Sequence, residues 1–327
     1  MERGEPRPSI IVLAHSRHAH LERTLDALKN AHQFSHHRLV VVVDGRWPKT
    51  EQVVARNVLP DVHIVATHGE HESPRVRIRK NLALGLNFAF EAYSSPYAIV
   101  VEDDIVASDD LLTFVSASFE KWHNDPLFRA INAFSNSKPS TGASPGDCIR
   151  VNYGVGWGWA LPKSTYKKIR KLLEMDSDEH WDSLIEPYMR TGFVICPTRS
   201  RVVNIGFDGS GAHSGSARDV ELGKQMAISV LQPGEWHSSA SNLTCRPFLS
   251  DWRDDVVTID RLDARRRVKI YFLGWIAWSL SNLIQIVERD ETLGRAGRLR
   301  ATRKKILRTS IPALRGHTVQ PQASKFS

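Results

Sequence analysis

The stretch Tyr97–Ala107, YAIVVEDDIVA, joins an apolar run to three consecutive carboxylates. Ala98–Val101 has the composition of a buried strand, and Glu102–Asp104 stand at its end, where successive side chains alternate between two sides. Adjacent carboxylates repel one another, so a hard divalent cation with oxygen ligands fits this triplet. The alternatives are a solvated strand end, or the start of a helix capped by Ser108–Asp110.

Further apolar runs on the N-terminal side of this stretch predict a series of strands, with amphipathic helical patterns between them. Strand and helix alternate along the chain, which is typical of an α/β fold with a largely parallel central sheet flanked by helices. The predicted strands are Ser9–Leu13, Leu39–Val43 and Val62–Ala66, and the predicted helices cover residues 21–31, Thr50–Asn57 and Arg77–Tyr93.

Polar groups follow several of these strands, and ligands of parallel sheets bind beyond the carboxyl ends of the strands. Arg17, Asp44 and the acidic triplet Glu102–Asp104 are therefore expected at one rim. A cation held there by Asp104 would coordinate substrate phosphates. Asp44 could then accept a hydrogen bond from the imide N–H of a base such as uracil, with Arg17 nearby. Asn81, in the preceding helix, is a further candidate donor contact.

This arrangement suits a nucleotide-diphosphate leaving group, whose developing charge a cation neutralises. The reaction then needs a base that takes a proton from the acceptor hydroxyl. Asp182, which follows Trp181, is the carboxylate we select for this role. The alternative is an ordinary helix N-cap before Ser183–Arg190.

The order of motifs resembles a GT-A fold glycosyltransferase, and most of all the family of the alpha-mannosyl-glycoprotein beta-1,2-N-acetylglucosaminyltransferase. The family's V-V-E-D-D strand matches Val100–Asp104, and its G-x-G-W segment matches Gly154–Trp157. Its W-D-D-W-type segment is similar to His180–Ser183, although Ser183 replaces the second Asp. Its G-x-S-H-G element is similar to Gly211–Gly215. The resemblance covers about two-thirds of the chain, from Ser9 to Gly215.

The resemblance implies a role for each matched residue. Asp104 binds Mn²⁺ or Mg²⁺, and Asp182 is the catalytic base. The residues expected to contact the nucleotide-sugar donor, which we expect to be UDP-linked, are Arg17, Asp44, Asn81, Glu102, Asp103, Trp157, Trp181 and His213. The implied reaction is a metal-dependent, inverting hexosyl or N-acetylhexosaminyl transfer to a hydroxyl of a glycan or lipid-linked glycan, as in polysaccharide biosynthesis.

Two other functions remain as alternatives. A nucleotidyltransferase of sugar phosphates would usually carry a glycine-rich, basic loop after the first strand, but His15–His20 contains no glycine. A non-catalytic, membrane-associated protein that binds glycans or nucleotides would show no hydrolysis of UDP-sugar. The sequence contains neither a G-x-G-x-x-G fingerprint after the first strand nor a G-K-[ST] phosphate loop, which argues against dinucleotide and P-loop chemistry.

The C-terminal residues 261–327 are expected to form a basic, amphipathic helical tail. Of the net charge of +8, much lies after Arg261, on both sides of the apolar segment Ile270–Val287. This segment contains tryptophan and a polar stripe, so it is predicted to lie in the interface of an anionic membrane. The alternatives are a helix packed on the catalytic domain and, third, a spanning helix. Nucleic acid is not expected as a partner.

Composition sets the remaining expectations. The 327 residues, 41% hydrophobic, predict a disordered N-terminal tail over 1–8 and a GT-A domain over 9–260, with a donor half to about residue 107 and an acceptor half from about 108. Three widely spaced cysteines argue against a disulfide framework, and the N-terminus has no apolar signal core. We therefore expect a cytoplasmic protein, peripheral at the inner face of the membrane.

Overall fold

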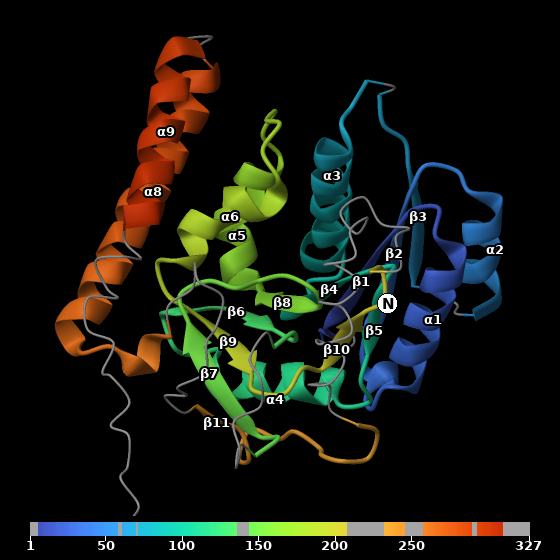
Figure 1. Ribbon diagram of the computed structural model, residues 1–327. Coiled ribbons are helices and arrows are strands. Elements are labelled where there is room, and N and C mark those ends of the chain that lie inside the picture. The colour runs from blue at the N-terminus through green and yellow to red at the C-terminus, as the bar shows by residue number, and fades with distance from the viewer. Residues whose placement is uncertain are drawn as a thin grey trace, which may run out of the picture.

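A mixed sheet forms the centre of the molecule (Figure 1). The computed structural model describes residues 6–57, 61–69, 71–135, 144–207, 232–245, 258–289 and 293–309. In this part of the chain the sheet has nine strands, in the order β11-β7-β9-β6-β8-β4-β1-β2-β3. They are β1 (Ser9–Ala14), β2 (Arg38–Asp44), β3 (Val62–Ala66), β4 (Tyr97–Glu102), β6 (Phe128–Asn132), β7 (Asp147–Val151), β8 (Trp159–Pro162), β9 (Phe193–Pro197) and β11 (Thr244–Cys245).

The strands from the N-terminal part of the chain, β3, β2, β1 and β4, pair in parallel. Their carboxyl ends therefore meet at one edge, which places Asp44 and Glu102 on the same side of the sheet. Beyond β4, strand β8 is inserted antiparallel between β4 and β6. Strand β9 is parallel to β6 and antiparallel to β7. The predicted α/β class with a mostly parallel central sheet is confirmed.

Helices cover both faces of the sheet, because alternate side chains of the buried strands point to opposite faces. Ile10 and Val12 of β1 belong to one apolar cluster with α1, α2 and α4, whereas Ile11 and Leu13 belong to a second cluster with α3, α5 and α6. The helices are α1 (His18–Asn30), α2 (Pro48–Asn57), α3 (Pro74–Asn87), α4 (Leu111–Trp122), α5 (Lys163–Leu173) and α6 (Trp181–Met189), with short 3-10 turns at Phe34–His36 and Ile259–Arg261.

The helix predicted over Arg77–Tyr93 differs from the one observed. Helix α3 begins at Pro74, after Ser73, whose hydroxyl accepts a hydrogen bond from the Val76 amide at 3.4 Å. The α-helix ends at Asn87, and a π-helical turn, Phe88–Ala92, follows it. Proline suits the first turn, where its missing N–H costs no hydrogen bond.

A short antiparallel ribbon connects two distant parts of the chain. Strand β5 (Ile105–Ala107) directly follows the acidic triplet and pairs with β10 (Val202–Asn204). The Ile205 amide also donates a hydrogen bond to the Asp104 carbonyl oxygen at 2.8 Å. The ribbon thereby holds residues 204–207 beside the end of β4.

The C-terminal helices α8 (Ala264–Arg289) and α9 (Leu293–Thr309) lie side by side, next to α5 and α6 (Figure 1). Helix α8 packs on the domain through Ile270 and Trp278, and the Trp278 ring centroid lies 5.0 Å from that of Tyr188. At Gly274 an added Cβ would lie 2.4 Å from the Arg190 carbonyl oxygen, so only glycine permits this contact. The segment predicted as a membrane-interface helix is thus packed on the catalytic domain along one face.

The other face of α8 exposes Val268, Phe272, Trp275 and Leu283. These positions recur at helical spacing and form one apolar stripe. Within the described ranges, no helix combines the length and the apolar character that crossing a bilayer requires. In the predicted N-terminal tail, residues 1–5 lie outside the described residues, and Arg7 donates hydrogen bonds to the Ser35 and His37 carbonyl oxygens at 2.6 Å.

Candidate active site

The acidic triplet lies at the end of β4, next to the end of β1. Arg17, at the start of α1, donates a hydrogen bond from Nη1 to Asp104 Oδ2 at 2.8 Å and forms an ion pair with Asp103. The His15 amide also donates to Asp103 Oδ2, at 3.1 Å. Arg17 thus reduces the repulsion between the two aspartates, and Asp103 is tied to the end of β1. The triplet is neither a solvated strand end nor the start of a helix.

Burial has a clear effect on the acids of this cluster. Burial, followed by the charges of Asp104 and Asp103, raises the pKa of Glu102 to about 7. Burial also raises the pKa of Asp103, although Arg17 opposes the shift. The carboxylates therefore repel each other in a site from which water is largely removed, where an additional cation would stabilise them.

A small pocket of about 110 Å³ lies beyond the ends of β1 and β2 and brings predicted donor residues together. Arg77 lies near Asp44, with Nη1 3.5 Å from Oδ2, and His68 Nε2 lies 2.7 Å from Asn81 Oδ1. The carboxylate and amide oxygens in this pocket can accept hydrogen bonds from a planar base. The predicted residues that line it are Arg17, Asp44, Asn81, Glu102 and Asp103.

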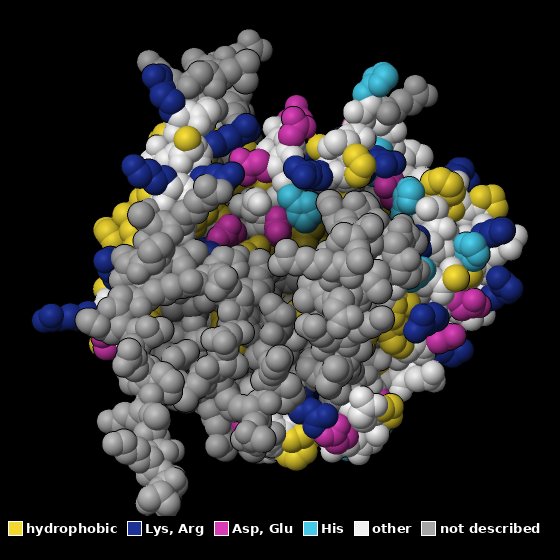
Figure 2. All heavy atoms as spheres, in the orientation of Figure 1, with side chains coloured by type: hydrophobic (Ala, Val, Ile, Leu, Met, Phe, Trp, Pro, Cys, Tyr) yellow, Lys and Arg dark blue, Asp and Glu magenta, His cyan; other side chains and the backbone are white. Residues whose placement is uncertain are grey.

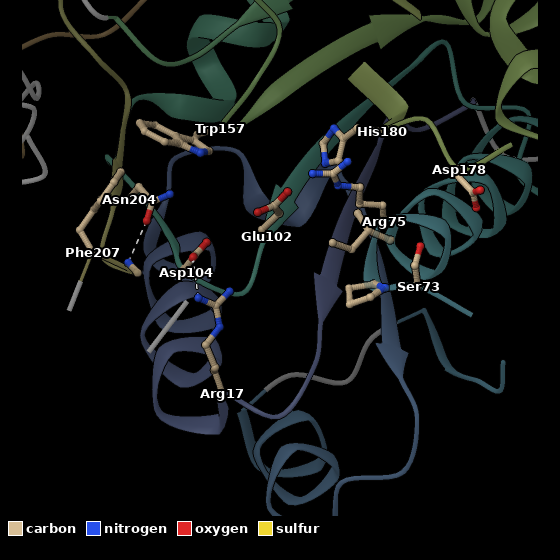
Figure 3. A pocket seen from close by; sticks show the side chains of 13 residues that line it. Arg17, Ser73, Arg75, Glu102, Asp104, Trp157, Asp178, His180, Asn204 and Phe207 are labelled. Atoms are coloured by element: carbon tan, nitrogen blue, oxygen red, sulfur yellow. Dashed lines mark hydrogen bonds and ion pairs between the residues drawn. The ribbon is translucent and has the colours of Figure 1, made fainter. Parts of the chain in front are cut away.

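A larger pocket of about 800 Å³ adjoins the small one, and Arg17 and Glu102 line both. Figure 3 shows Asp104 and Arg17 on one side of Glu102, and His180 and Arg75 on the other. The two pockets together provide room for a nucleotide, a diphosphate and a sugar in sequence.

Trp157 and Trp181, both predicted as donor contacts, occupy different environments. Trp157 lines the large pocket and packs on Phe134 and Phe207, with ring centroids 4.6 and 5.4 Å away. Trp181 is buried and stacked on Trp159, with ring centroids 5.2 Å apart and planes 6° from parallel. Trp181 does not line the large pocket and instead supports the wall behind Glu102.

The predicted base, Asp182, lies in the first turn of α6, beside His180. His180 Nδ1 is 2.7 Å from Asp182 Oδ1, and the Ser183 amide donates to the same oxygen. Burial raises the pKa of Asp182, but the hydrogen bonds from His180 and Ser183 outweigh it and hold the pKa below its usual range. His180 lines the large pocket, whereas Asp182 does not, so the histidine is the member of this pair that a ligand meets.

Asp104 meets one requirement of a metal ligand. Its Oδ1 is buried without a hydrogen-bond partner among the described residues, while its Oδ2 accepts a hydrogen bond from the Arg17 guanidinium. Gly206 leaves space there, because an added Cβ would lie 2.1 Å from Asp104 Oδ2. Within the described part of the chain, no group of three or more His, Cys, Asp or Glu side chains is arranged to hold a metal ion.

Several pocket residues were not predicted from the sequence. Ser73 and Arg75 precede or begin α3, and Asn204 and Phe207 come from the end of β10. His180 lies in the segment similar to the W-D-D-W motif but was not predicted to contact a ligand, although a histidine directly before Trp-Asp was a usable signal. His213, the remaining predicted donor contact, lies outside the described residues.

The family of the chain follows from comparison with known proteins. A family model described as the GNT-I family matches residues 2–220. The chain belongs to the GNT-I family. The predicted resemblance is thereby confirmed, and this GNT-I family member is a glycosyltransferase that acts on a nucleotide sugar.

The GNT-I family member is also similar to solved structures of S. aureus TarS. Residues 1–349 of TarS share 13% sequence identity at a TM-score of 0.44, with 96% of this chain and 93% of that chain covered. The same fragment in complex with UDP shares 14% sequence identity at a TM-score of 0.43, and the same shares of the two chains are covered. A longer TarS structure shares 14% sequence identity at a TM-score of 0.45, with 96% of this chain and 56% of that chain covered.

Proposed function

We propose that this protein transfers a hexosyl or N-acetylhexosaminyl group from a UDP-sugar to a hydroxyl of a glycan or lipid-linked glycan, with inversion and with Mn²⁺ or Mg²⁺ bound at Asp104. The observation that carries this proposal is one continuous cavity. On one side it has an Asp104 oxygen without a hydrogen-bond partner among the described residues, and on the other it has His180. This arrangement separates the group that holds the departing diphosphate from the group that activates the acceptor.

The small pocket is the proposed site of the uracil base. Asp44 accepts a hydrogen bond from the imide N–H, and Asn81 contacts the same end of the donor. Glu102 and Asp103 bind ribose or sugar hydroxyls, and Arg17 binds the diphosphate beside Asp104. Trp157 packs against the donor in the large pocket. His213, whose position the structure does not describe, remains a proposed diphosphate contact.

In the proposed reaction the acceptor hydroxyl attacks the anomeric carbon from the side opposite the diphosphate. Its proton passes to the His180–Asp182 pair, in which Asp182 is the predicted base and His180 faces the pocket. Arg17 stabilises charge on the departing diphosphate through its donors. A divalent cation, when bound, neutralises part of that same charge.

Donor identity can be tested with UDP, GDP, CDP and dTDP sugars, each with and without Mn²⁺. UDP-sugar with Mn²⁺ is expected to raise the Tm most, by several degrees, because ligand at about 100 times its Kd stabilises the native state by about 2.7 kcal/mol. Slow hydrolysis of the same sugar would then exclude a protein that only binds nucleotides. A larger shift with another nucleotide, or an equal shift without Mn²⁺, would contradict the proposal.

The exposed stripe on α8 supports a second part of the proposal, contact with an anionic membrane from the cytoplasmic side. Phe272 and Trp275 are 62% and 49% exposed, and the exposed cations Arg265 and Lys269 lie on the same helix. Apolar side chains next to cations are what an anionic bilayer surface attracts. The tail would then keep the site near a lipid-linked acceptor.

The double variant Phe272→Ser and Trp275→Ser is expected to reduce flotation with phosphatidylglycerol vesicles at least fivefold, because it removes two buried anchors in the lipid. Trp47→Ser is the matched control, since Trp47 is also exposed but lies far along the chain, next to α2. Unchanged flotation of the double variant, or equal loss with Trp47→Ser, would disprove membrane contact through α8.

A further inference from the structure

A third pocket, of about 480 Å³, lies between the N-terminal part of α6 and α9. Arg75, Asp178 and His180 line both this pocket and the large donor pocket, so the two are continuous at the proposed base. Figure 2 shows charged side chains of both signs around the hollow between the α8–α9 pair and α3. Room for a second ligand therefore adjoins the place where the proton is taken up.

Helix α9 forms one wall of this third pocket. Arg303 of α9 is buried, forms an ion pair with Glu179, and lies 3.4 Å from the Ser281 hydroxyl of α8. Glu179 directly precedes His180, so the contact joins α9 to the segment that carries the proposed base. Helix α9 lies beyond residue 220, where the family match ends.

The acidic residues of the pocket are mostly neutralised by the protein itself. Glu179 is paired with Arg303 and lies 3.6 Å from Arg300, measured between Oε1 and Nε. Glu186 is paired with the buried Arg190, with Oε1 and Nη2 2.6 Å apart. These two carboxylates therefore contribute little negative charge to a ligand.

The cations are less fully neutralised. Arg75 and Lys304 are exposed, and within the described ranges neither has an ion-pair partner. The Nε of Arg303 is also buried without a hydrogen-bond partner there. Against them stands one exposed acid, Asp178, so the pocket presents a net positive charge beside a carboxylate that can bind hydroxyls.

We infer that this third pocket binds the acceptor, and that the acceptor carries an anionic group, phosphate or carboxylate, near its reacting hydroxyl. The inference rests on the proposed function. Arg75 and Lys304 bind the anion, Asp178 and Ser183 bind hydroxyls, and the reacting hydroxyl lies at His180. A neutral glycan would leave both cations without a partner.

The test compares binding of glucose 6-phosphate, glucuronate and glucose by calorimetry, with and without UDP and Mn²⁺. At least one of the two anionic sugars is expected to bind about tenfold more tightly than glucose, and their order tells phosphate from carboxylate. Lys304→Glu and Arg75→Glu should each reduce this preference about tenfold, which corresponds to about 1.4 kcal/mol. Both positions are exposed, and an acidic residue in the first turn of α3 favours the helix.

Lys305→Glu is the matched control, because Lys305 is the next residue of α9 and does not line the pocket. Equal affinity for the three sugars, or an equal effect of Lys305→Glu, would overturn the inference. So would a Lys304→Glu protein that loses flotation with phosphatidylglycerol vesicles but keeps its affinity for the anionic sugar. Because sugar binding is measured without turnover, a protein that binds the anionic sugar but no nucleotide would refute the proposed function alone.

Discussion

Asp104→Ala is expected to abolish metal-dependent donor binding and to lower kcat/KM at least a hundredfold. The substitution removes the buried oxygen that has no hydrogen-bond partner among the described residues, together with the oxygen that Arg17 contacts. Without this carboxylate, the cation and the diphosphate lose their anchor on the protein, and transition-state charge is less well stabilised. Calorimetry with UDP in Mn²⁺ and in EDTA measures the binding, and initial transfer rates measure the turnover.

Asp104→Asn and Asp26→Ala are the control variants for Asp104→Ala. Asparagine keeps the shape next to Arg17 but removes the charge, so it should bind UDP equally in Mn²⁺ and in EDTA. Asp26 is an exposed acid on α1, outside the small and the large pocket. Its loss should change neither UDP binding nor the transfer rate. If folded Asp104→Ala bound UDP in Mn²⁺ as tightly as the unaltered protein, Asp104 would not be the metal ligand.

Asp182→Asn and His180→Gln are each expected to lower kcat by a factor of about 100 to 10,000, and Asp182→Asn should leave the Kd for the donor within about twofold. General-base catalysis contributes rate factors of this order, and Asp182 does not line the donor pocket. Because the two side chains hydrogen-bond to each other, the double variant should be little worse than either single one. Single-turnover rates, with donor binding measured separately, distinguish loss of chemistry from loss of affinity.

Matched controls for this pair exist elsewhere on the surface. Asp176→Asn changes an exposed acid close in sequence, and His123→Gln changes an exposed histidine after α4; both should retain normal rates. Near-normal transfer by a folded Asp182→Asn protein would show that another group takes the proton. Near-normal transfer by His180→Gln alone would leave Asp182 as the direct base.

Local sequence was sufficient for many elements of the fold. The strand Val62–Ala66 was predicted with the bounds that the structure shows. The strands predicted over Ser9–Leu13 and Leu39–Val43 differ from β1 and β2 by at most one residue at each end, since a largely apolar run determines each of them. The insertion of β8 between β4 and β6 was not predicted. It depends on pairing between segments far apart in the chain, which no local pattern reports.

In the site, too, some residues could be placed from the sequence and others could not. Arg17, Asp44 and Glu102–Asp104 meet as expected, because the carboxyl ends of parallel strands share one edge. The wall formed by Asn204 and Phe207 was not predicted, since the β5–β10 ribbon brings it in from a hundred residues away.

For Trp181 and Asp182, the motif gave the position in sequence but not the orientation. In the structure Trp181 stacks inward on Trp159, and His180 is the residue that faces the pocket.

The β5–β10 ribbon has a consequence for the order in which a growing chain acquires its site. The carboxylate of Asp104 is synthesised early, but Gly206 and the Ile205 amide, which lie against it, follow about a hundred residues later. Domains form as units while the ribosome extends the chain. A nascent polypeptide that ends before β10 therefore lacks one wall of the large pocket, and we expect it to bind a nucleotide sugar only after residue 207 has left the exit tunnel.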